Sequence, residues 1–434
     1  MKSRTFVGFG FGPIQSALFL YEAARSERFS RYVIAEVDGW IVDAVRRNGG
    51  QYAINIARPD RIEQALISGV ELCNPAVAEH RETILEAIAE GDEIATCLPS
   101  VAFYDTGGET SVARTLAAGL ARRKAPHPTI IYTAENNNHA AELLLECLKK
   151  HSGQSVLDKV QVLNTVIGKM SGVITEPETI SRLKLGTLTP GLPKAVLVEE
   201  FNRILISRIA LPGFRRGIEA FVEKPDLLPF EEAKLYGHNA IHALIGCLAA
   251  RRGLAAMSDA AAHRDIMGTA EAAFIGECGA ALTCRYASLG DPLFTPPGFR
   301  AYAMDLLERI VRPTLNDLVS RVVRDLVRKL GYDDRFYGAM RLALGAKIRP
   351  VNMARGAAAA VRLLCENWDS AGPASAKLKR PKLPLAAEST TRLLREIWEG
   401  RGGAEADTLA SLTWEALEPM QKEGCHQTRT GPDA

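Results

Sequence analysis

Short runs of buried-type residues alternate with amphipathic stretches along the first part of the chain. Four runs rich in β-branched and aromatic residues predict strands, at 5–7, 32–35, 93–98 and 129–133. Between them, apolar residues recur at helical spacing and predict helices, at 14–24, 41–47 and 111–124. Strands and helices in alternation predict a parallel sheet with helices on both faces. We therefore expect an α/β domain over residues 1–195.

The pattern changes in the second half of the chain. From residue 233 to residue 364 nearly every segment has helical periodicity and few strand formers, and the stretches 257–280 and 302–330 are predicted to be helical. We expect a mostly α-helical C-terminal domain over residues 196–370. Residues 371–434 begin with a stretch rich in Pro, Lys, Ala and Ser, which predicts a linker. Two appended helices, at 387–399 and 406–423, should follow it.

Composition excludes several classes of protein. The 434 residues carry a net charge of +2, which does not favour a nucleic-acid or membrane-surface protein. No apolar run reaches the roughly 20 residues that a membrane helix needs. The eight cysteines form no Cys-x-x-Cys pair, which argues against a structural zinc site and fits a reducing compartment. We expect a metal-free, cytoplasmic monomer or homodimer.

A glycine-rich loop joins the first predicted strand to the first predicted helix. Such a loop lets backbone N–H groups approach a pyrophosphate at the start of a helix, as in a Rossmann-type domain. Glu36 closes the second strand, where a carboxylate accepts hydrogen bonds from the adenine ribose and repels the extra phosphate of NADP. The sequence therefore predicts NAD. The residues expected to contact it are Gly8, Gly10, Phe11, Gly12, Pro13, Ile14 and Glu36, with Pro13 in place of the third glycine.

The same loop permits other interpretations. The run from Gly10 to Gln15 also resembles the FAD-binding loop of flavin-dependent N-hydroxylating monooxygenases, in which a Gly-Pro pair opens the helix. Those enzymes need a second glycine-rich site for NADPH, and we find no convincing one in the sequence. A tight turn without a ligand is a further alternative, and the loop by itself does not decide among the three.

Three polar residues on a predicted helix are candidates for catalysis. At about 100° per residue, Lys234, His242 and Asn239 fall at roughly 0°, 80° and 140° around the helix axis. Burying such groups together is costly unless they have partners or a task. A lysine with a lowered pKa can take the proton of an alcohol, Asn239 can donate to the developing oxyanion, and His242 can orient the group. A surface helix with incidental polar residues is the alternative.

This arrangement resembles the polyol-specific long-chain dehydrogenases, the family of mannitol 2-dehydrogenase and mannitol-1-phosphate 5-dehydrogenase. Their signature is a lysine, an asparagine five residues on and a histidine three further, which matches Lys234, Asn239 and His242. The resemblance implies zinc-independent, NAD-dependent oxidation of a secondary alcohol of a polyol or polyol phosphate to the ketose, with Lys234 as general base. It also implies that Asn136, in Ala134-Glu135-Asn136, is a second oxyanion donor, although the residue could equally cap a turn.

A basic stretch resembles the corresponding helix of the mannitol-1-phosphate enzymes. On a single helix Arg321, Arg324 and Arg328 would lie within about 60° of one another and could grip a polyol or its phosphate. The alternative is that this row of charges is simply the solvated face of a helix.

Two departures from the family pattern concern the substrate. Residues 167–170 stand where the family carries an Asp-Arg pair, and Arg312 stands where it usually shows asparagine before proline. The substrate could therefore differ from mannitol and its phosphate. A dinucleotide-binding regulatory protein without catalysis is the alternative that these departures favour.

Overall fold

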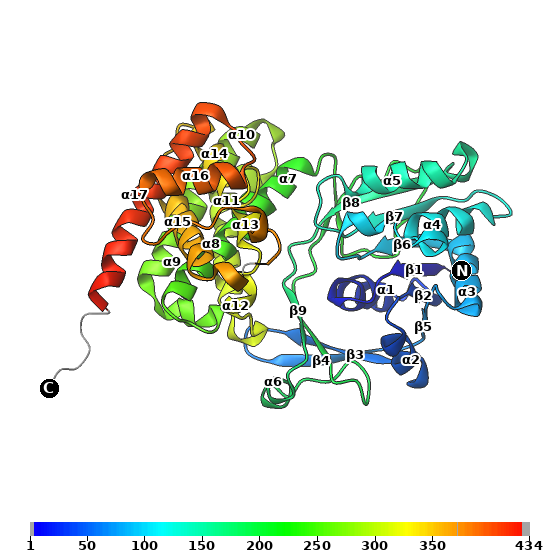
Figure 1. Ribbon diagram of the computed structural model, residues 1–434. Helices are drawn as coiled ribbons and strands as arrows, with labels where there is room; N and C mark the ends of the chain where they lie inside the picture. Colours follow the sequence, from blue (N-terminus) through cyan, green and yellow to red (C-terminus); the bar gives the residue numbers. More distant parts are fainter. Residues whose placement is uncertain (1–3, 371, 428–434) are drawn as a thin grey trace. The chain divides into compact units, whose positions relative to one another are not determined.

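The chain folds into two compact units, which we describe separately. Figure 1 shows the computed structural model, which describes residues 4–370 and 372–427. The units are Met1–Leu228 and Pro229–Ala434. This division lies further along the chain than the boundary expected at residue 195. The strands at 195–199 and 205–207 both form hydrogen bonds with strands of the first unit. These two strands therefore belong to the first unit.

The larger sheet of the first unit contains the dinucleotide-type core that the sequence predicts. Its strands are β1 Thr5–Phe9, β2 Arg31–Ala35, β5 Val70–Cys73, β6 Gly91–Thr96, β7 Thr129–Thr133, β8 Val160–Val166, β11 Leu205–Ser207 and β12 Val222–Lys224. They lie in the order β12-β11-β8-β7-β6-β1-β2-β5, and those from β8 to β5 are all parallel. Numbered along the chain, the six parallel strands follow the order 3-2-1-4-5-6 of the Rossmann fold. The expected parallel α/β domain is confirmed.

Helices cover both faces of this sheet (Figure 1). The helical elements of the first unit are the π-helical turn η1 Gln15–Phe19, the helices α1 Leu20–Arg25, α2 Gly39–Arg47, α3 Ala78–Glu90, α4 Val112–Ala121 and α5 Ala140–His151, the helix α6 Pro177–Arg182 beside the second sheet, and the short turns η2 Val101–Phe103, η3 Gly108–Thr110 and η4 Gln154–Val156. Successive strand residues point to opposite faces. Phe6 of β1 therefore joins the apolar cluster under η1, α1 and α2, whereas Val7 joins the cluster under α3, α4 and α5.

A second, four-stranded sheet completes the first unit. Its strands are β3 Tyr52–Ala57, β4 Ile62–Ile67, β9 Ser171–Ile174 and β10 Ala195–Glu199, in the order β4-β3-β10-β9. β10 pairs in parallel with β3 and antiparallel with β9. This sheet explains why the chain beyond residue 195 still belongs to the first unit.

The second unit is built from helices, as expected. Its elements are α7 Leu228–Glu232, η5 Ala233–Asn239, α8 Ala240–Arg251, η6 Met257–Ala262, α9 Arg264–Glu271, η7 Ala272–Gly279, α10 Ala280–Tyr286, η8 Ala287–Leu289, η9 Pro292–Phe294, α11 Pro296–Ile310, η10 Pro313–Leu315, α12 Val319–Val322, α13 Leu326–Lys329, α14 Tyr337–Gly345, α15 Val351–Glu366, η11 Trp368–Ser370, η12 Ser375–Lys377, α16 Ala387–Ile397 and α17 Gly403–Gln427. In the described residues, no helix combines the length and apolarity that crossing a bilayer requires.

The end of the chain packs into this unit. The predicted helices after the proline-rich stretch form as α16 and α17, and α17 packs against α14, α15 and α16. The described part of residues 371–434 is therefore integrated into the second unit, whereas we expected an appended segment. Residue 371 and residues 428–434 lie outside the described residues.

The single helix expected over residues 302–330 is wrong. α11 ends at Ile310, and the chain continues as two short helices with Asp325 between them in a left-handed conformation (φ 55°). The buried Lys329 ammonium donates a 2.5 Å hydrogen bond to the Val322 carbonyl, which the break leaves without a helical partner. The three arginines therefore lie on different elements, with Arg321 on α12, Arg324 in the break and Arg328 on α13.

Candidate active site

The glycine loop makes a tight turn directly after β1. Gly10 has a φ of +82°, which favours glycine, and its N–H donates to the Ala35 carbonyl at 2.8 Å. A Cβ at this position would lie only 2.6 Å from the carbonyl oxygen of Cys97. Both the conformation and the close approach of β6 therefore require glycine here.

The frame of the loop differs from the one predicted. Gly8 lies inside β1, and helical structure begins at Pro13, so Gly10 and Gly12 are the loop glycines and Gln15 stands at the third position. Glycine usually stands there to let the helix pack closely on the strand. Gly8 provides that space instead, because a Cβ on Gly8 would lie 2.7 Å from the Gln15 Cδ. The Gln15 amide is fully buried, and neither of its polar atoms has a partner in the described structure.

The interpretation that Gly8 makes room for the larger Gln15 is testable. Gly8→Ala should lower the free energy of unfolding by about 1–3 kcal/mol, because the new methyl group overfills the space that Gln15 occupies. Adding Gln15→Ala to that variant should restore part of the loss, since the Gln15 atoms that collide are removed and only Ile34 Cδ1, at 2.7 Å, still has to shift. Urea unfolding of the single and double variants measures both effects. A double variant no more stable than Gly8→Ala would contradict the proposed exchange.

A cavity of about 420 Å³ opens over the loop. Its walls come from the loop, from the ends of β1, β2 and β6, and from α4; they are formed by Phe9, Gly10, Phe11, Gly12, Pro13, Ile14, Ala35, Glu36, Val37, Pro75, Cys97, Leu98, Pro99, Thr110, Val112, Thr115 and Ala134. All the predicted cofactor contacts except Gly8 line it. The hydroxyl of Thr115 is buried and has no partner in the described structure, so a polar group of a ligand could satisfy it.

Glu36 has a structural task at the edge of this cavity. One carboxylate oxygen accepts a hydrogen bond from the Phe11 N–H at 2.6 Å, and the other accepts one from the Asp38 N–H at 2.8 Å. An ionised carboxylate offers about four acceptor positions. Glu36 therefore holds the loop and can still accept hydrogen bonds from ligand hydroxyls.

The segment after β7 places Asn136 next to a buried acid. Glu135 accepts hydrogen bonds from Thr96 at 2.9 Å, from the Leu98 N–H at 2.8 Å and from the Tyr104 hydroxyl. Burial raises the pKa of Glu135, and these bonds oppose the rise. Asn136 itself is exposed at the carboxyl end of β7. Glu135 thus ties this end of β7 to β6 and η2 and sets where Asn136 emerges.

In the second unit, a π-helical turn carries the predicted catalytic group. Lys234 and Asn239 both lie on η5, and His242 follows on α8. Backbone bonds in a π-helix join residues five apart, which is the spacing of Lys234 and Asn239. The next spacing, of three residues, keeps His242 on the same face of the α-helix. The wide turn therefore aligns the three side chains more closely than a regular helix would.

The environment of this turn alters its ionisable groups. Burial of the amine among protein atoms lowers the pKa of Lys234 to about 8; the nearby Glu231 opposes this change and Arg335 adds to it. His238 is buried on the same turn, and burial first, then the neighbouring His242 and Arg309, hold its pKa well below the usual value. Lys234 can therefore lose its proton near neutral pH, and His238 stays neutral.

His242 has a carboxylate partner that the sequence did not suggest. Its Nε2 lies 2.8 Å from one oxygen of the buried Asp317, and Arg321 donates to the other oxygen at 2.9 Å from Nε and 2.7 Å from Nη2. Arg321 is thus engaged with Asp317. All three arginines of the predicted substrate group are exposed, and Arg328 pairs with Asp334 at 3.4 Å. The Asn239 amide has no partner among the described residues.

The two departures from the family pattern are both buried in polar contacts. Lys169 donates to Asn202 Oδ1 at 2.6 Å and to the Phe201 carbonyl at 3.1 Å. Arg312 is mostly buried and pairs with Glu308 at 3.5 Å. The lysine is therefore an internal anchor of the first unit. In the described residues, no three His, Cys, Asp or Glu side chains gather as they would to hold a metal ion.

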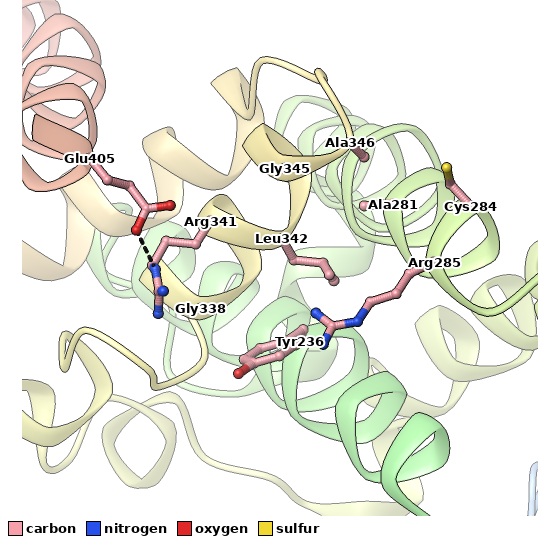
Figure 2. Close-up of a pocket in the computed structure, with 10 residues that line it drawn as sticks. All are labelled: Tyr236, Ala281, Cys284, Arg285, Gly338, Arg341, Leu342, Gly345, Ala346 and Glu405. Carbon is pink, nitrogen blue, oxygen red and sulfur yellow. Dashed lines mark hydrogen bonds and ion pairs between the residues drawn. The ribbon is translucent and has the colours of Figure 1, made fainter. Parts of the chain in front are cut away.

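A separate cavity of about 410 Å³ lies in the second unit (Figure 2). It is lined by Tyr236, Ala281, Cys284, Arg285, Gly338, Arg341, Leu342, Gly345, Ala346 and Glu405. Tyr236 follows Lys234 by two residues on η5, a spacing that does not put two side chains on the same face. Both arginines have carboxylate partners, since Arg341 pairs with Glu405 at 2.8 Å and Arg285 with Glu232 at 3.5 Å.

Comparisons with known proteins agree with this architecture. The family described as the mannitol dehydrogenase C-terminal domain matches residues 226–395. The mannitol-1-phosphate 5-dehydrogenase of Bacillus licheniformis is 27% identical over 340 residues, which cover 77% of this chain and 81% of the relative. The enzyme of the same name from Lactococcus lactis subsp. cremoris is 26% identical over 343 residues, which cover 77% of this chain and 80% of the relative.

Two solved structures share the fold. A substrate-free D-sorbitol dehydrogenase superposes with a TM-score of 0.76 at 13% identity, covering 97% of this chain and 94% of that one. The mannitol 2-dehydrogenase of Pseudomonas fluorescens, solved with NAD and D-mannitol, gives a TM-score of 0.69 at 15% identity, covering 98% and 93%. The resemblance that the Lys-Asn-His motif indicates is thereby confirmed: residues 226–395 match the mannitol dehydrogenase C-terminal domain, and the chain is similar to mannitol-1-phosphate 5-dehydrogenases over 77% of its length.

Proposed function

We propose that this protein is a zinc-independent, NAD-dependent dehydrogenase that oxidises a secondary alcohol of a polyol or polyol phosphate to the ketose. The observation that carries the proposal is the amine of Lys234, whose pKa burial lowers to about 8, on a π-helical turn followed by Asn239 and His242. The mannitol-1-phosphate dehydrogenases to which the chain is similar act on a substrate of this class.

The first unit fits the adenosine and pyrophosphate parts of NAD. The loop cavity of about 420 Å³, the positive φ of Gly10 and the unpartnered Thr115 hydroxyl all support a ligand at this place. Gly10, Phe11, Gly12, Pro13 and Ile14 would hold the pyrophosphate, and Glu36 would accept from the ribose hydroxyls. Gly8 lies inside β1 and does not line the cavity, so we do not count it among the proposed cofactor contacts. Bound NAD would supply the hydride acceptor.

Each polar group at η5 has a role in this proposal. The neutral Lys234 amine takes the proton of the reacting hydroxyl as general base. The Asn239 amide donates to the oxygen as its negative charge develops, and Asn136 of the first unit is the proposed second donor. His242 orients the substrate. Arg324 and Arg328 stay predicted contacts for a phosphate, whereas the engagement of Arg321 with Asp317 argues for a positioning role instead.

A substrate panel tests the proposal. The purified chain should produce NADH from NAD with at least one hexitol, pentitol or hexitol phosphate, and NADP should be used far less well because of Glu36. Dialysis against a zinc chelator should leave the rate unchanged. NAD binding without turnover on any polyol would favour a regulatory protein, and a yellow protein with flavin absorption would favour the monooxygenase instead.

A further inference from the structure

His242 is the middle member of a short hydrogen-bonded chain. The Asp317 carboxylate contacts His242 Nε2 at 2.8 Å through one oxygen and takes both Arg321 donors on the other. Burial alone would raise the pKa of Asp317, but His242 and Arg321 outweigh burial and lower it. Asp317 is therefore an acceptor only, so the hydrogen between the two residues belongs to His242 Nε2.

The second nitrogen of the His242 ring, Nδ1, does not contact Asp317. In the neutral ring Nδ1 then carries a bare lone pair, and no described residue bonds to it. The side chain of His242 is 19% exposed, so a ligand can reach it. The closest ring is that of His238, edge-on with its centroid 6.3 Å away. Nδ1 of His242 is thus left for a ligand.

The backbone around Asp317 is held firmly. Its carbonyl accepts from the Met257 N–H at 2.8 Å, and the Val319 N–H donates to the Ala255 carbonyl at 3.0 Å. Gly246, one turn after His242 on α8, lets α12 come close, since a Cβ there would collide with Val322. The carboxylate therefore meets the ring as part of a fixed packing of α12 on α8.

We infer that Asp317 and Arg321 are positioning residues that hold His242 in the Nε2–H tautomer, so that Nδ1 accepts a hydrogen bond from a substrate hydroxyl. This inference rests on the proposed function. The accepted hydroxyl is a neighbour of the reacting one, because the proton of the reacting hydroxyl goes to Lys234 and a lone pair facing the developing oxyanion would repel it. The site thus selects an alcohol with a second hydroxyl near the reacting one.

Asp317→Asn tests the tautomer directly. Arg321 would keep the amide oxygen, so the amide N–H₂ would face His242 Nε2 and drive the ring to the Nδ1–H form, which donates where it should accept. Nitrogen NMR of 15N-histidine-labelled protein, with the His242 signals assigned by His242→Gln, should show Nε2–H in the wild type and Nδ1–H in the variant. The kcat should fall about 10–100-fold, because two donors then face each other and the substrate hydroxyl loses its acceptor.

The double variant D317N/R321M gives the decisive comparison. Without the two Arg321 donors the amide can turn its oxygen to Nε2, so the Nε2–H signal should return and kcat should rise at least tenfold above that of Asp317→Asn. Asp265→Asn, at an exposed carboxylate paired with Arg252, is the matched control and should change neither readout.

Two results would overturn the inference. One is an Asp317→Asn protein that keeps the Nε2–H form, and the other is a double variant that recovers neither the signal nor the rate. NADH binding, measured on every variant, separates loss of folding from loss of positioning. Because the tautomer is read without turnover, a wild type that shows Nε2–H yet oxidises no polyol would contradict the proposed function and leave the role of Asp317 standing.

Discussion

Lys234→Ala should reduce kcat for polyol oxidation by about 10³-fold, within the range expected when a general base is removed. The variant loses the amine whose pKa burial lowers to about 8, and its polar neighbours do not replace it, since the pKa of His238 is held well below the usual value and the Asn239 amide is not basic. The glycine loop belongs to the other unit, so NADH titration by fluorescence should give a dissociation constant within about threefold of the wild type.

The pH dependence of the wild type should report the same amine. Only the neutral form can accept the alcohol proton, so kcat/KM for oxidation should rise with pH and level off above a pKa of about 8. Ketose reduction needs the protonated form as acid, so its rate should fall through the same range. An oxidation rate that is flat from pH 6 to about pH 10 would contradict Lys234 as the base.

Lys329 is the matched control for this experiment. Burial lowers its pKa to about 8 as well, but its ammonium donates to backbone carbonyls at the break after α12. Lys329→Met should therefore lower the melting temperature, while the folded fraction keeps the pH profile of oxidation. A profile that disappears with Lys329 and survives in Lys234→Ala would exchange the roles of the two lysines.

Gly10→Val should have the second largest effect, on dinucleotide binding. Its φ of +82° is strained for a β-branched residue, and its Cβ would meet the Cys97 carbonyl at 2.6 Å, which is backbone and cannot turn aside. Relief requires the loop to move off β6, and the N–H groups that should face the pyrophosphate move with it. Calorimetry should show the affinity for NADH falling at least 100-fold, equivalent to about 2.7 kcal/mol.

The neighbouring Gly12 is the control for this prediction. A Cβ on Gly12 would meet no atom within 4 Å in the protein alone. Gly12→Ala should therefore leave the free energy of unfolding unchanged within about 0.5 kcal/mol. If Gly10→Val binds NADH as tightly as the wild type does, the strained turn is not what shapes the site.

The sequence predicts the parts of this fold that depend on local pattern. β7 has the bounds predicted from its β-branched run, and the helical character of the second unit follows from periodicity. The second sheet escapes such analysis because β3 and β10 are short and pair across about 140 intervening residues. The helix break at Asp325 also escapes it, since the stabilising contact comes from Lys329 further along the chain.

The residues of the candidate site also fall into two groups, those that the sequence reveals and those that only the fold reveals. The motif residues Lys234, Asn239 and His242 are visible because their spacing is a family signature. Asp317 carries no signal of its own, because an acid 75 residues from its histidine becomes meaningful only when α12 packs on α8. The third loop glycine was misassigned for a related reason, since only the observed end of β1 fixes the frame.

The change of helix type at Asn239 has a consequence for how relatives of this protein diverge. The lysine and the asparagine are five residues apart, the hydrogen-bond spacing of a π-helix, and the asparagine and the histidine are three apart, a spacing that keeps side chains on one face of an α-helix. Deleting one residue from η5 would restore a regular helix and rotate the lysine by about 100° away from its companions. The number of residues in this turn should therefore be under stronger constraint than those of its side chains that take no part in the site.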